Sequence, residues 1–375
     1  MNYNGWERDY LLYKSTYDEL FEECISAGEQ DVSTEFLDDE IAEISKRKYA
    51  VTCASATDGL QFALQAFGVG PGQEVLVPDF SWISSASAVS MVGATPVFCD
   101  IDENTHQITL DSVKRMVTEN TVAIIYPTLF GAMFPEIFAV ERWCRKRGIT
   151  FIEDSAQSLG VELNGTVAGS IGDISVYSFN DNKVIAGING GGAVMTNNEK
   201  IYETVKRLAY HGRGTNYADR DVTLLGRNSK MYLFNAKIIS MRLKRREHFQ
   251  KLRQEIARHY FDLFIDGNDF VKIQELPFGL NHNYHKFVLK FESKEMRDKV
   301  KQHCGTNLHY PDPISANTYY SGKYKTDNGN KTAQKVADTI MSLPCHAWMT
   351  TLDVEEICDI LDTGLYKSYI YNVRR

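Results

Sequence analysis

The sequence lacks the segments that direct a chain to or across a membrane. Residues 1–9 contain neither a basic stretch nor an apolar core, so we expect no signal peptide. No apolar run approaches the roughly 20 residues that a membrane-spanning helix requires. The seven cysteines are scattered and form no C-x-x-C pair, which disfavours a disulfide framework and a zinc site. We therefore expect a cytoplasmic protein with no membrane partner and no metal.

The sequence also contains fewer basic than acidic residues. Lys and Arg number 41 against 49 Asp and Glu, which gives a formal net charge of -8 and a pI near 5.7. Basic clusters such as residues 242–246 are interpreted as solvated faces of helices. A nucleic-acid partner or an anionic membrane surface is therefore not expected.

The chain is long enough to predict two domains, and the first of them has an alternating pattern. Short apolar runs, typical of buried strands, occupy residues 74–78, 95–99, 122–126, 150–153 and 174–178. Between them, helical spacing is found over residues 57–67, 83–91, 110–117 and 136–147. This alternation requires crossover connections, and it predicts a mostly parallel α/β sheet covered on both faces.

The pattern changes from about Ser229 onward. A long charged helix is predicted through the 240s and 250s, followed by a strand over residues 284–291. Two further helices are predicted over about 294–303 and 331–341. We predict a large ligand-binding α/β domain over residues 1–235 and a smaller C-terminal α/β domain over residues 236–375.

Two polar residues stand where predicted strands end, and ligands of parallel sheets bind at those ends. Asp154 follows the strand at 150–153, where, taken alone, a helix N-cap is the favoured interpretation. Lys183 lies in the loop after the strand at 174–178, and a lone loop lysine is usually a solvated charge. This lysine is followed by Gly190–Gly192, and glycines let a backbone approach a bulky ligand closely.

The segment 53–60 places small and hydroxyl residues at the start of an apolar helix. Free backbone N–H groups and the helix dipole make such a start an anion site, although Ser55 or Thr57 as an ordinary N-cap fits equally well. The fingerprints G-x-G-x-x-G and G-x-x-x-x-G-K-[ST] are absent at the expected places, which disfavours dinucleotide and P-loop sites.

A helix start for phosphate, a strand-end carboxylate and a nearby lysine together describe pyridoxal phosphate (PLP). The carboxylate would hold the protonated ring nitrogen, and the lysine would form a Schiff base with the aldehyde. Trp82, one turn beyond the strand that ends near residue 80, is placed to cover the ring.

Several motifs, in order along nearly the whole chain, resemble those of the DegT-type nucleotide-sugar aminotransferases. This family is a branch of the aspartate-aminotransferase superfamily, whose members have the fold-type I architecture. The segments that carry the resemblance are residues 68–78, 92–98, 152–157, 172–173, 178–183, 226–231 and 342–346.

The resemblance implies a role for each matching residue. Lys183 is the Schiff-base lysine and carries protons between cofactor and substrate, while Asp154 pairs with the ring nitrogen. The other cofactor contacts implied are Gln157 on the ring hydroxyl side, Trp82 stacked on the ring, and Ala56, Thr57 and Ser178 on the phosphate. Asn228 would reach the phosphate of the second subunit, in a homodimer with shared active sites. His309 and Tyr310 lie in the segment that resembles a substrate-facing loop.

The implied reaction moves an amino group from glutamate to a keto carbon of a nucleotide-linked sugar. We prefer C-4 of a keto-deoxy sugar as the acceptor carbon, because residues 79–83 resemble the C-4 type; C-3 is the alternative, favoured by the spacing from Lys183 to the glycine run. Ala56–Thr57 replaces the Gly-Thr that family members often have, and Asn189 replaces an acidic residue before two glycines. Lys183 distinguishes the chain from the dehydratase branch, which has histidine there. A PLP-binding regulatory homologue without turnover is the remaining alternative.

Overall fold

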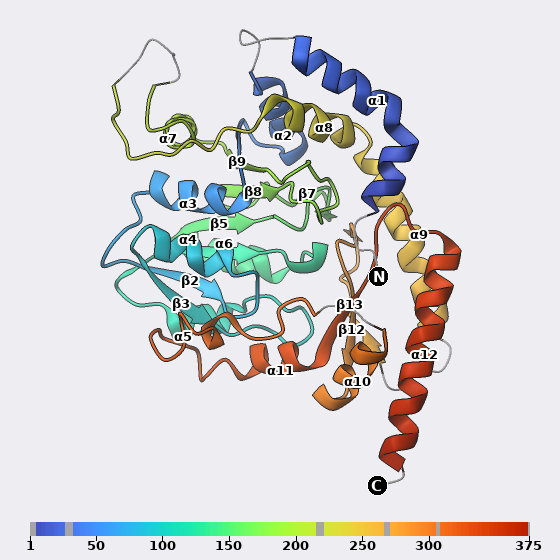
Figure 1. Cartoon of the computed structure of the whole chain (residues 1–375). Helices are drawn as coiled ribbons and strands as arrows, with labels where there is room; N and C mark the ends of the chain where they lie inside the picture. The colour runs from blue at the N-terminus through green and yellow to red at the C-terminus, as the bar shows by residue number, and fades with distance from the viewer. Residues whose placement is uncertain (1–4, 27–32, 215–220, 266–270, 305–307, 374–375) are drawn as a thin grey trace.

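A seven-stranded sheet forms the centre of the computed structural model, which describes residues 5–26, 33–214, 221–265, 271–304 and 308–373 (Figure 1). Its strand order is β1-β9-β8-β5-β4-β2-β3. The strands are β1 (Tyr49–Cys53), β2 (Glu74–Pro78), β3 (Thr95–Cys99), β4 (Thr121–Pro127), β5 (Thr150–Asp154), β8 (Ile174–Ser178) and β9 (Gly192–Thr196). Strand β9 is antiparallel to both neighbours and the other pairings are parallel, so the predicted mostly parallel sheet is confirmed.

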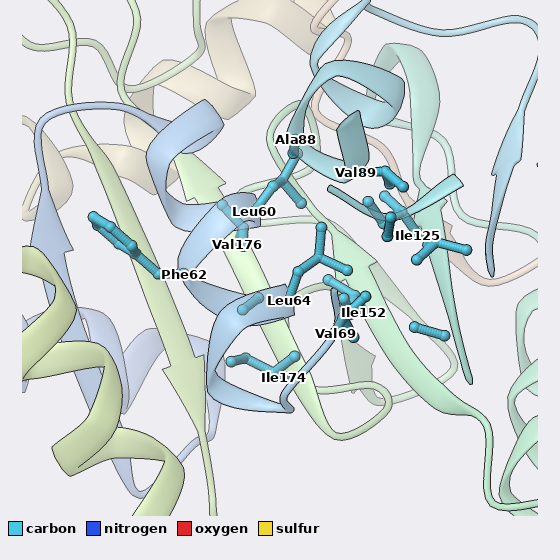
Figure 2. Packing of buried hydrophobic residues seen from close by; sticks show 14 of the residues in the cluster. Leu60, Phe62, Leu64, Val69, Ala88, Val89, Ile125, Ile152, Ile174 and Val176 are labelled. Atoms are coloured by element: carbon cyan, nitrogen blue, oxygen red, sulfur yellow. The ribbon is translucent and has the colours of Figure 1, made fainter. Parts of the chain in front are cut away.

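Helices cover both faces of this sheet, because neighbouring residues along each strand point to opposite sides. In β4, Ile125 joins one hydrophobic cluster, whereas Ile124 and Tyr126 join another. Figure 2 shows the first cluster, in which Leu60 and Leu64 lie against strand residues. The helices of that face are α3 (Ala56–Ala66), α4 (Ser84–Met91) and α7 (Glu199–Ala209). The other face is covered by α2 (Glu35–Ser45), α5 (Leu110–Met116), α6 (Glu136–Arg145) and α8 (Leu233–Leu243).

A second, three-stranded antiparallel sheet carries its own hydrophobic cluster. Its order is β10-β12-β13, with β10 (Val271–Ile273), β12 (Phe287–Phe291) and β13 (Ile340–Leu343). The helices packed on it are α9 (Arg246–Ile265), α10 (Lys294–Cys304) and α12 (Thr351–Val373). The proposed domain division after residue 235 stays a prediction; α8, which spans that boundary, packs with the large sheet.

Two predicted helices differ from those observed. The long helix of the 240s and 250s is two helices, α8 and α9, because α8 packs on the large sheet and α9 on the small one. The helix predicted over 331–341 ends earlier, as α11 (Lys331–Thr339). Residues 340–343 instead pair with β12 as strand β13.

The segment 311–330 returns to the large sheet and brings a loop to the end of β2. Ile314 and Tyr320 belong to the same hydrophobic cluster as α3 and α4. Buried Asp79, next after β2, accepts hydrogen bonds from Ser315 N and Oγ and from Asn330 Nδ2, each at 2.6 Å. The short helix η3 (Ile314–Ala316) lies in this segment.

The remaining elements lie outside the two main sheets. They are α1 (Trp6–Ser26), η2 (Leu129–Gly131) and a small sheet of β6 (Glu162–Leu163), β7 (Thr166–Val167) and β11 (Leu280–Asn281). In the parts of the chain that the structure describes, no helix combines the length and apolar character needed to cross a membrane.

Candidate active site

A cavity of about 650 Å³ lies at the carboxyl ends of β2, β5 and β8. The structure brings together nearly all the residues predicted for the site, which come from distant parts of the sequence. Those that line the cavity are Ala56, Thr57, Trp82, Asp154, Gln157, Ser178, Lys183, His309 and Tyr310. Asn228, the remaining predicted residue, does not line it, and its side chain is exposed.

Asp154 is the last residue of β5, and Lys183 lies in the loop that follows β8. No helix starts after Asp154 in this stretch, and its Oδ1 instead accepts the N–H of Ala156 at 3.1 Å in a turn. Burial raises the pKa of Asp154, while that N–H and the charge of Lys183 lower it. Burial lowers the pKa of Lys183 to about 8, against the opposing effects of Asp154 and Asp181. The helix-cap interpretation of Asp154 is therefore wrong.

The start of α3 forms another part of the wall. Ser55 is its N-cap and accepts the N–H of Asp58 at 3.1 Å, which leaves the first N–H groups of the helix, at Ala56 and Thr57, without an acceptor inside the helix. The Thr57 hydroxyl lies 2.7 Å from that of Ser84. The positive end of the helix dipole and two hydroxyls thus face the cavity and suit a phosphate.

The glycines at positions 190–192 are needed for two different reasons. Gly190 and Gly191 line the cavity with positive φ angles of 90° and 136°. A Cβ on Gly192 would lie 2.4 Å from the carbonyl carbon of Ser55 and 2.5 Å from Ala56 N. A glycine is therefore required there because β9 begins directly against the start of α3.

Gln157 is held at both ends of its side chain. Its Oε1 accepts the N–H of Phe130 at 2.7 Å, and its Nε2 donates to the hydroxyl of Tyr310 at 2.7 Å. Asn283 Nδ2 donates to the carbonyl oxygens of Gln157 and Leu159, both at 3.0 Å. Burial raises the pKa of Tyr310, which keeps its hydroxyl neutral. The amide therefore has one fixed orientation, and it connects the sheet to the segment that contains His309 and Tyr310.

Two wall residues, His285 and Lys286, escaped the sequence analysis, which placed both in a strand over residues 284–291. Strand β12 starts only at Phe287, and the two residues before it line the cavity. Lys286 is 5% exposed, and burial together with the charges of Arg253 and Lys183 lowers its pKa to about 7. The available signal was a pair of basic residues directly before an apolar strand.

Trp82 and Asn228 lie at the edge of the site. Trp82 lines the cavity but is 62% exposed. Asn228 pairs by its backbone with Tyr210, and the next residue, Ser229, accepts the N–H of Ala54 at 2.8 Å. Ala54 itself lines the cavity, so the segment of Asn228 runs directly behind the wall at the start of α3.

These residues fit PLP by their chemistry. The wall offers an amine of lowered pKa, a buried carboxylate and a helix start with adjacent hydroxyls. Among the residues that the structure describes, no group of three or more His, Cys, Asp or Glu is placed to hold a metal ion.

Residues 22–362 match the model of the DegT/DnrJ/EryC1/StrS aminotransferase family. The chain belongs to this family. It is therefore an enzyme of the sugar-aminotransferase type, and the PLP cofactor predicted from the sequence is confirmed. The chain is also similar in structure to a DegT/DnrJ/EryC1/StrS aminotransferase from Brucella abortus, with a TM-score of 0.87 and 25% identity. That match covers 97% of this chain and 99% of the other, which confirms the fold-type I prediction.

Three curated relatives of this DegT-family enzyme differ in their names. The chain is 31% identical to the UDP-2-acetamido-2-deoxy-3-oxo-D-glucuronate aminotransferase of Pseudomonas aeruginosa, over 87% of this chain and 89% of that protein. It is 32% identical to the UDP-N-acetyl-3-dehydro-alpha-D-glucosamine 3-aminotransferase of Acidithiobacillus ferrooxidans, over 88% of each. It is also 30% identical to a pleiotropic regulatory protein of Geobacillus stearothermophilus, over 82% of each.

Proposed function

We propose that this protein transfers an amino group from glutamate to the C-3 keto carbon of a nucleotide-linked sugar. The observation that carries the proposal is the single cavity in which Lys183, Asp154 and the start of α3 meet. The names of two relatives supply the substrate class, because both describe aminotransferases of UDP-linked sugars with a 3-keto group.

Each wall residue then has a defined task. Bound PLP supplies an electron sink that stabilises negative charge on the carbon that loses a proton. Lys183, with a pKa near 8, is partly neutral at neutral pH and can both attack an aldehyde and carry a proton. Asp154 would keep a proton on the ring nitrogen, and Gln157, fixed by Phe130 and Tyr310, would contact the ring hydroxyl group. Of the other residues that line the cavity, Trp82 would cover the ring, and Ala56, Thr57 and Ser178 would hold the phosphate.

The relatives favour C-3 over the C-4 acceptor that residues 79–83 suggested. The spacing between Lys183 and the glycine run points the same way. The regulatory alternative has one relative in its favour by name. Against it, the cavity retains the lysine and the carboxylate that turnover needs and binding alone does not.

The test supplies purified protein with glutamate and, in separate reactions, a 3-keto and a 4-keto UDP-sugar. We expect amino sugar from the 3-keto substrate, with the new C–N bond located by NMR. Amination of the 4-keto sugar alone would restore the C-4 interpretation. Absence of turnover with both, and no conversion of the cofactor to its amine form by glutamate, would favour the regulatory alternative.

The shared active site is a further part of this proposal. Asn228 is exposed just behind the wall at the start of α3, and the nearby Leu225 and Tyr232 are 88% and 82% exposed. Such apolar exposure suits an interface, and two-fold symmetry would make each subunit both give and receive an asparagine. Asn228 would then contact the phosphate in the second subunit of a homodimer.

Mixed dimers of Lys183→Ala with an inactive Asn228 variant test this sharing. If Asn228 acts across the interface, each mixed dimer has one intact site, and random exchange restores roughly a quarter of wild-type activity. If Asn228 serves its own subunit, activity stays at background after verified subunit exchange.

A further inference from the structure

Lys286 is a buried lysine in the cavity wall that the proposed transamination chemistry does not use. It directly precedes β12 and is 5% exposed. Its backbone N–H donates to the carbonyl of Phe130 at 3.3 Å, and the N–H of Phe130 holds Gln157. The lysine is therefore tied to the same part of the site as the predicted cofactor contact Gln157.

The wall around Lys286 is poor in negative charge. Of the residues that the structure places in the cavity wall, Asp154 and Asp312 are the acidic ones. Asp154 has a task at the ring nitrogen, and Asp312 is exposed. Lys183 and Lys286 both line the cavity, and Arg253 is close enough to lower the pKa of Lys286. The cavity thus presents positive charge to whatever enters it.

His285 adds a second polar group at the same place. It is 4% exposed and lines the cavity beside Lys286. Among the described residues its Nδ1 is buried and has no hydrogen-bond partner. Burial and the surrounding cations hold the pKa of His285 well below its usual range, so the ring is neutral and one nitrogen can donate a hydrogen bond.

The buried Nδ1 of His285 has no partner among the described residues, and the wall gathers positive charge, so this part of the cavity favours an anionic ligand. A carboxylate suits it, because a carboxylate favours the charged form of a lysine and accepts hydrogen bonds on two oxygens.

We propose that Lys286 and His285 form a subsite for a carboxylate group of a substrate. The inference rests on the proposed transamination and specifies how that site selects its ligands. The carboxylate has two sources, the amino donor glutamate or an acidic sugar such as a uronate. Both use the same charge-assisted contact to Lys286.

The variants for the test are Lys286→Met, which removes the charge at similar length, and Lys286→Arg, which keeps it. Lys290→Met is the matched control, since Lys290 lies on β12, the strand that Lys286 directly precedes, and pairs with Glu103 at 2.6 Å outside the cavity wall. Circular dichroism of each PLP-loaded protein establishes that it is folded.

The first measurement is calorimetric binding of glutarate, a dicarboxylate that cannot react, to each PLP-loaded protein. We expect Lys286→Met to weaken glutarate binding about 10- to 100-fold, and Lys286→Arg to recover part of the loss. Lys290→Met should bind glutarate like the wild type.

Two half-reactions then identify the source of the carboxylate. If Lys286 binds the carboxylate of glutamate, Lys286→Met should need a higher glutamate concentration for half-maximal conversion of the cofactor. If Lys286 binds a sugar carboxylate, Lys286→Met should no longer discriminate between a 3-keto uronate and its uncharged 3-keto counterpart. Either pattern supports the subsite.

The subsite is overturned if Lys286→Met matches the wild type in glutarate affinity, in glutamate dependence and in discrimination between the two sugars. Failure of the proposed function gives a different result, because wild-type protein would then aminate neither sugar while the glutarate measurement still reports on Lys286.

Discussion

The cavity has two walls that are built in different ways. One lies at the edge of the large sheet, where Asp154 ends β5, Lys183 follows β8, and the start of α3 lies beside the start of β9. The other comes from residues 285–286 and 308–317, which follow no strand of that sheet. Single contacts join the second wall to the first, such as Gln157 to Tyr310 and Phe130 to Lys286.

Because of this difference, we expect the first wall to carry out the reaction and the second wall to select the ligand. The sheet edge is held by strand pairing on both sides of β5 and β8, so the groups that must stay within reach of the cofactor have rigid supports. The second wall is not part of that strand pairing and is held by side-chain packing, such as that of Ile314 and Tyr310, and by a few buried hydrogen bonds. We therefore expect a change there to alter what binds before it alters the reaction. Variants of the first wall should reduce turnover, and variants of the second should change affinity or stability.

The largest expected effect is at Lys183. Lys183→Ala removes both the nucleophile and the proton carrier, so turnover should fall by about 10⁴-fold or more. Lys183→Arg keeps the charge but offers no neutral amine near pH 8, and it should be equally inactive. Borohydride reduction of the wild-type enzyme should fix PLP on Lys183, as peptide mass spectrometry would show. Reduced cofactor on another lysine would contradict the assignment.

Asp154 and Glu153 provide a matched pair of neighbouring buried carboxylates. Glu153 accepts the N–H groups of Gly169 and Ile171, both at 2.8 Å, whereas Asp154 faces the cavity. Asp154→Asn should lower turnover by about 100-fold or more with a smaller loss of PLP affinity, because the ring nitrogen loses its counter-charge. Glu153→Gln should instead cost about 1–3 kcal/mol in the free energy of unfolding and leave turnover nearly unchanged. Equal turnover in the two variants would remove the special role of Asp154.

The first wall could be predicted from sequence because its signals are local. Asp154 and Lys183 each follow an apolar run, and parallel strands bring such ends to one edge of the sheet. The start of α3 was recognised by its small and hydroxyl residues, although Ser55 proved to be its cap.

Of the second wall, only the segment of His309 and Tyr310 was predicted, through the resemblance to the family, because the residues of this wall meet only through tertiary packing. His285 and Lys286 lie beside the cavity because of where the small sheet packs, and the pair of basic residues before an apolar strand does not indicate which part of the large sheet that strand will face. The contact between Asp79 and Ser315 spans 236 residues. The split between α8 and α9 has the same origin, since each helix packs on a different sheet.

Asp79 should show how the second wall is held. Asp79→Ala leaves the N–H and hydroxyl of Ser315 and the amide of Asn330 without their acceptor in a buried site. We expect a loss of about 2–3 kcal/mol in the free energy of unfolding, measured with urea, and a raised KM for the sugar with a smaller change in kcat. Asp111→Ala, at an exposed carboxylate, should change stability by less than about 0.5 kcal/mol. A lowered kcat at unchanged KM would mean that the two walls are not separable in function.

The smallest expected effect is a shift in the titration of Lys183. In the cofactor-free protein, burial favours the neutral amine and lowers its pKa to about 8, while the carboxylates of Asp154 and then Asp181 favour the charged form. The amine reacts only when deprotonated, so labelling of Lys183 by acetic anhydride should rise with a midpoint near pH 8, well below the ordinary value of about 10.4. Removing a carboxylate removes support for the charged form, so Asp154→Asn should move the midpoint to lower pH, by up to about one unit. Asp181→Asn should move it in the same direction by less, because Asp181 contributes less than Asp154.

Peptide mass spectrometry at a series of pH values gives the midpoint for each protein, and the reactivity of the reagent is common to all three. A midpoint that rises in Asp154→Asn would mean that the charge of Asp154 does not raise the pKa of the Lys183 amine. A midpoint near 10 in the wild type would mean that burial does not lower that pKa.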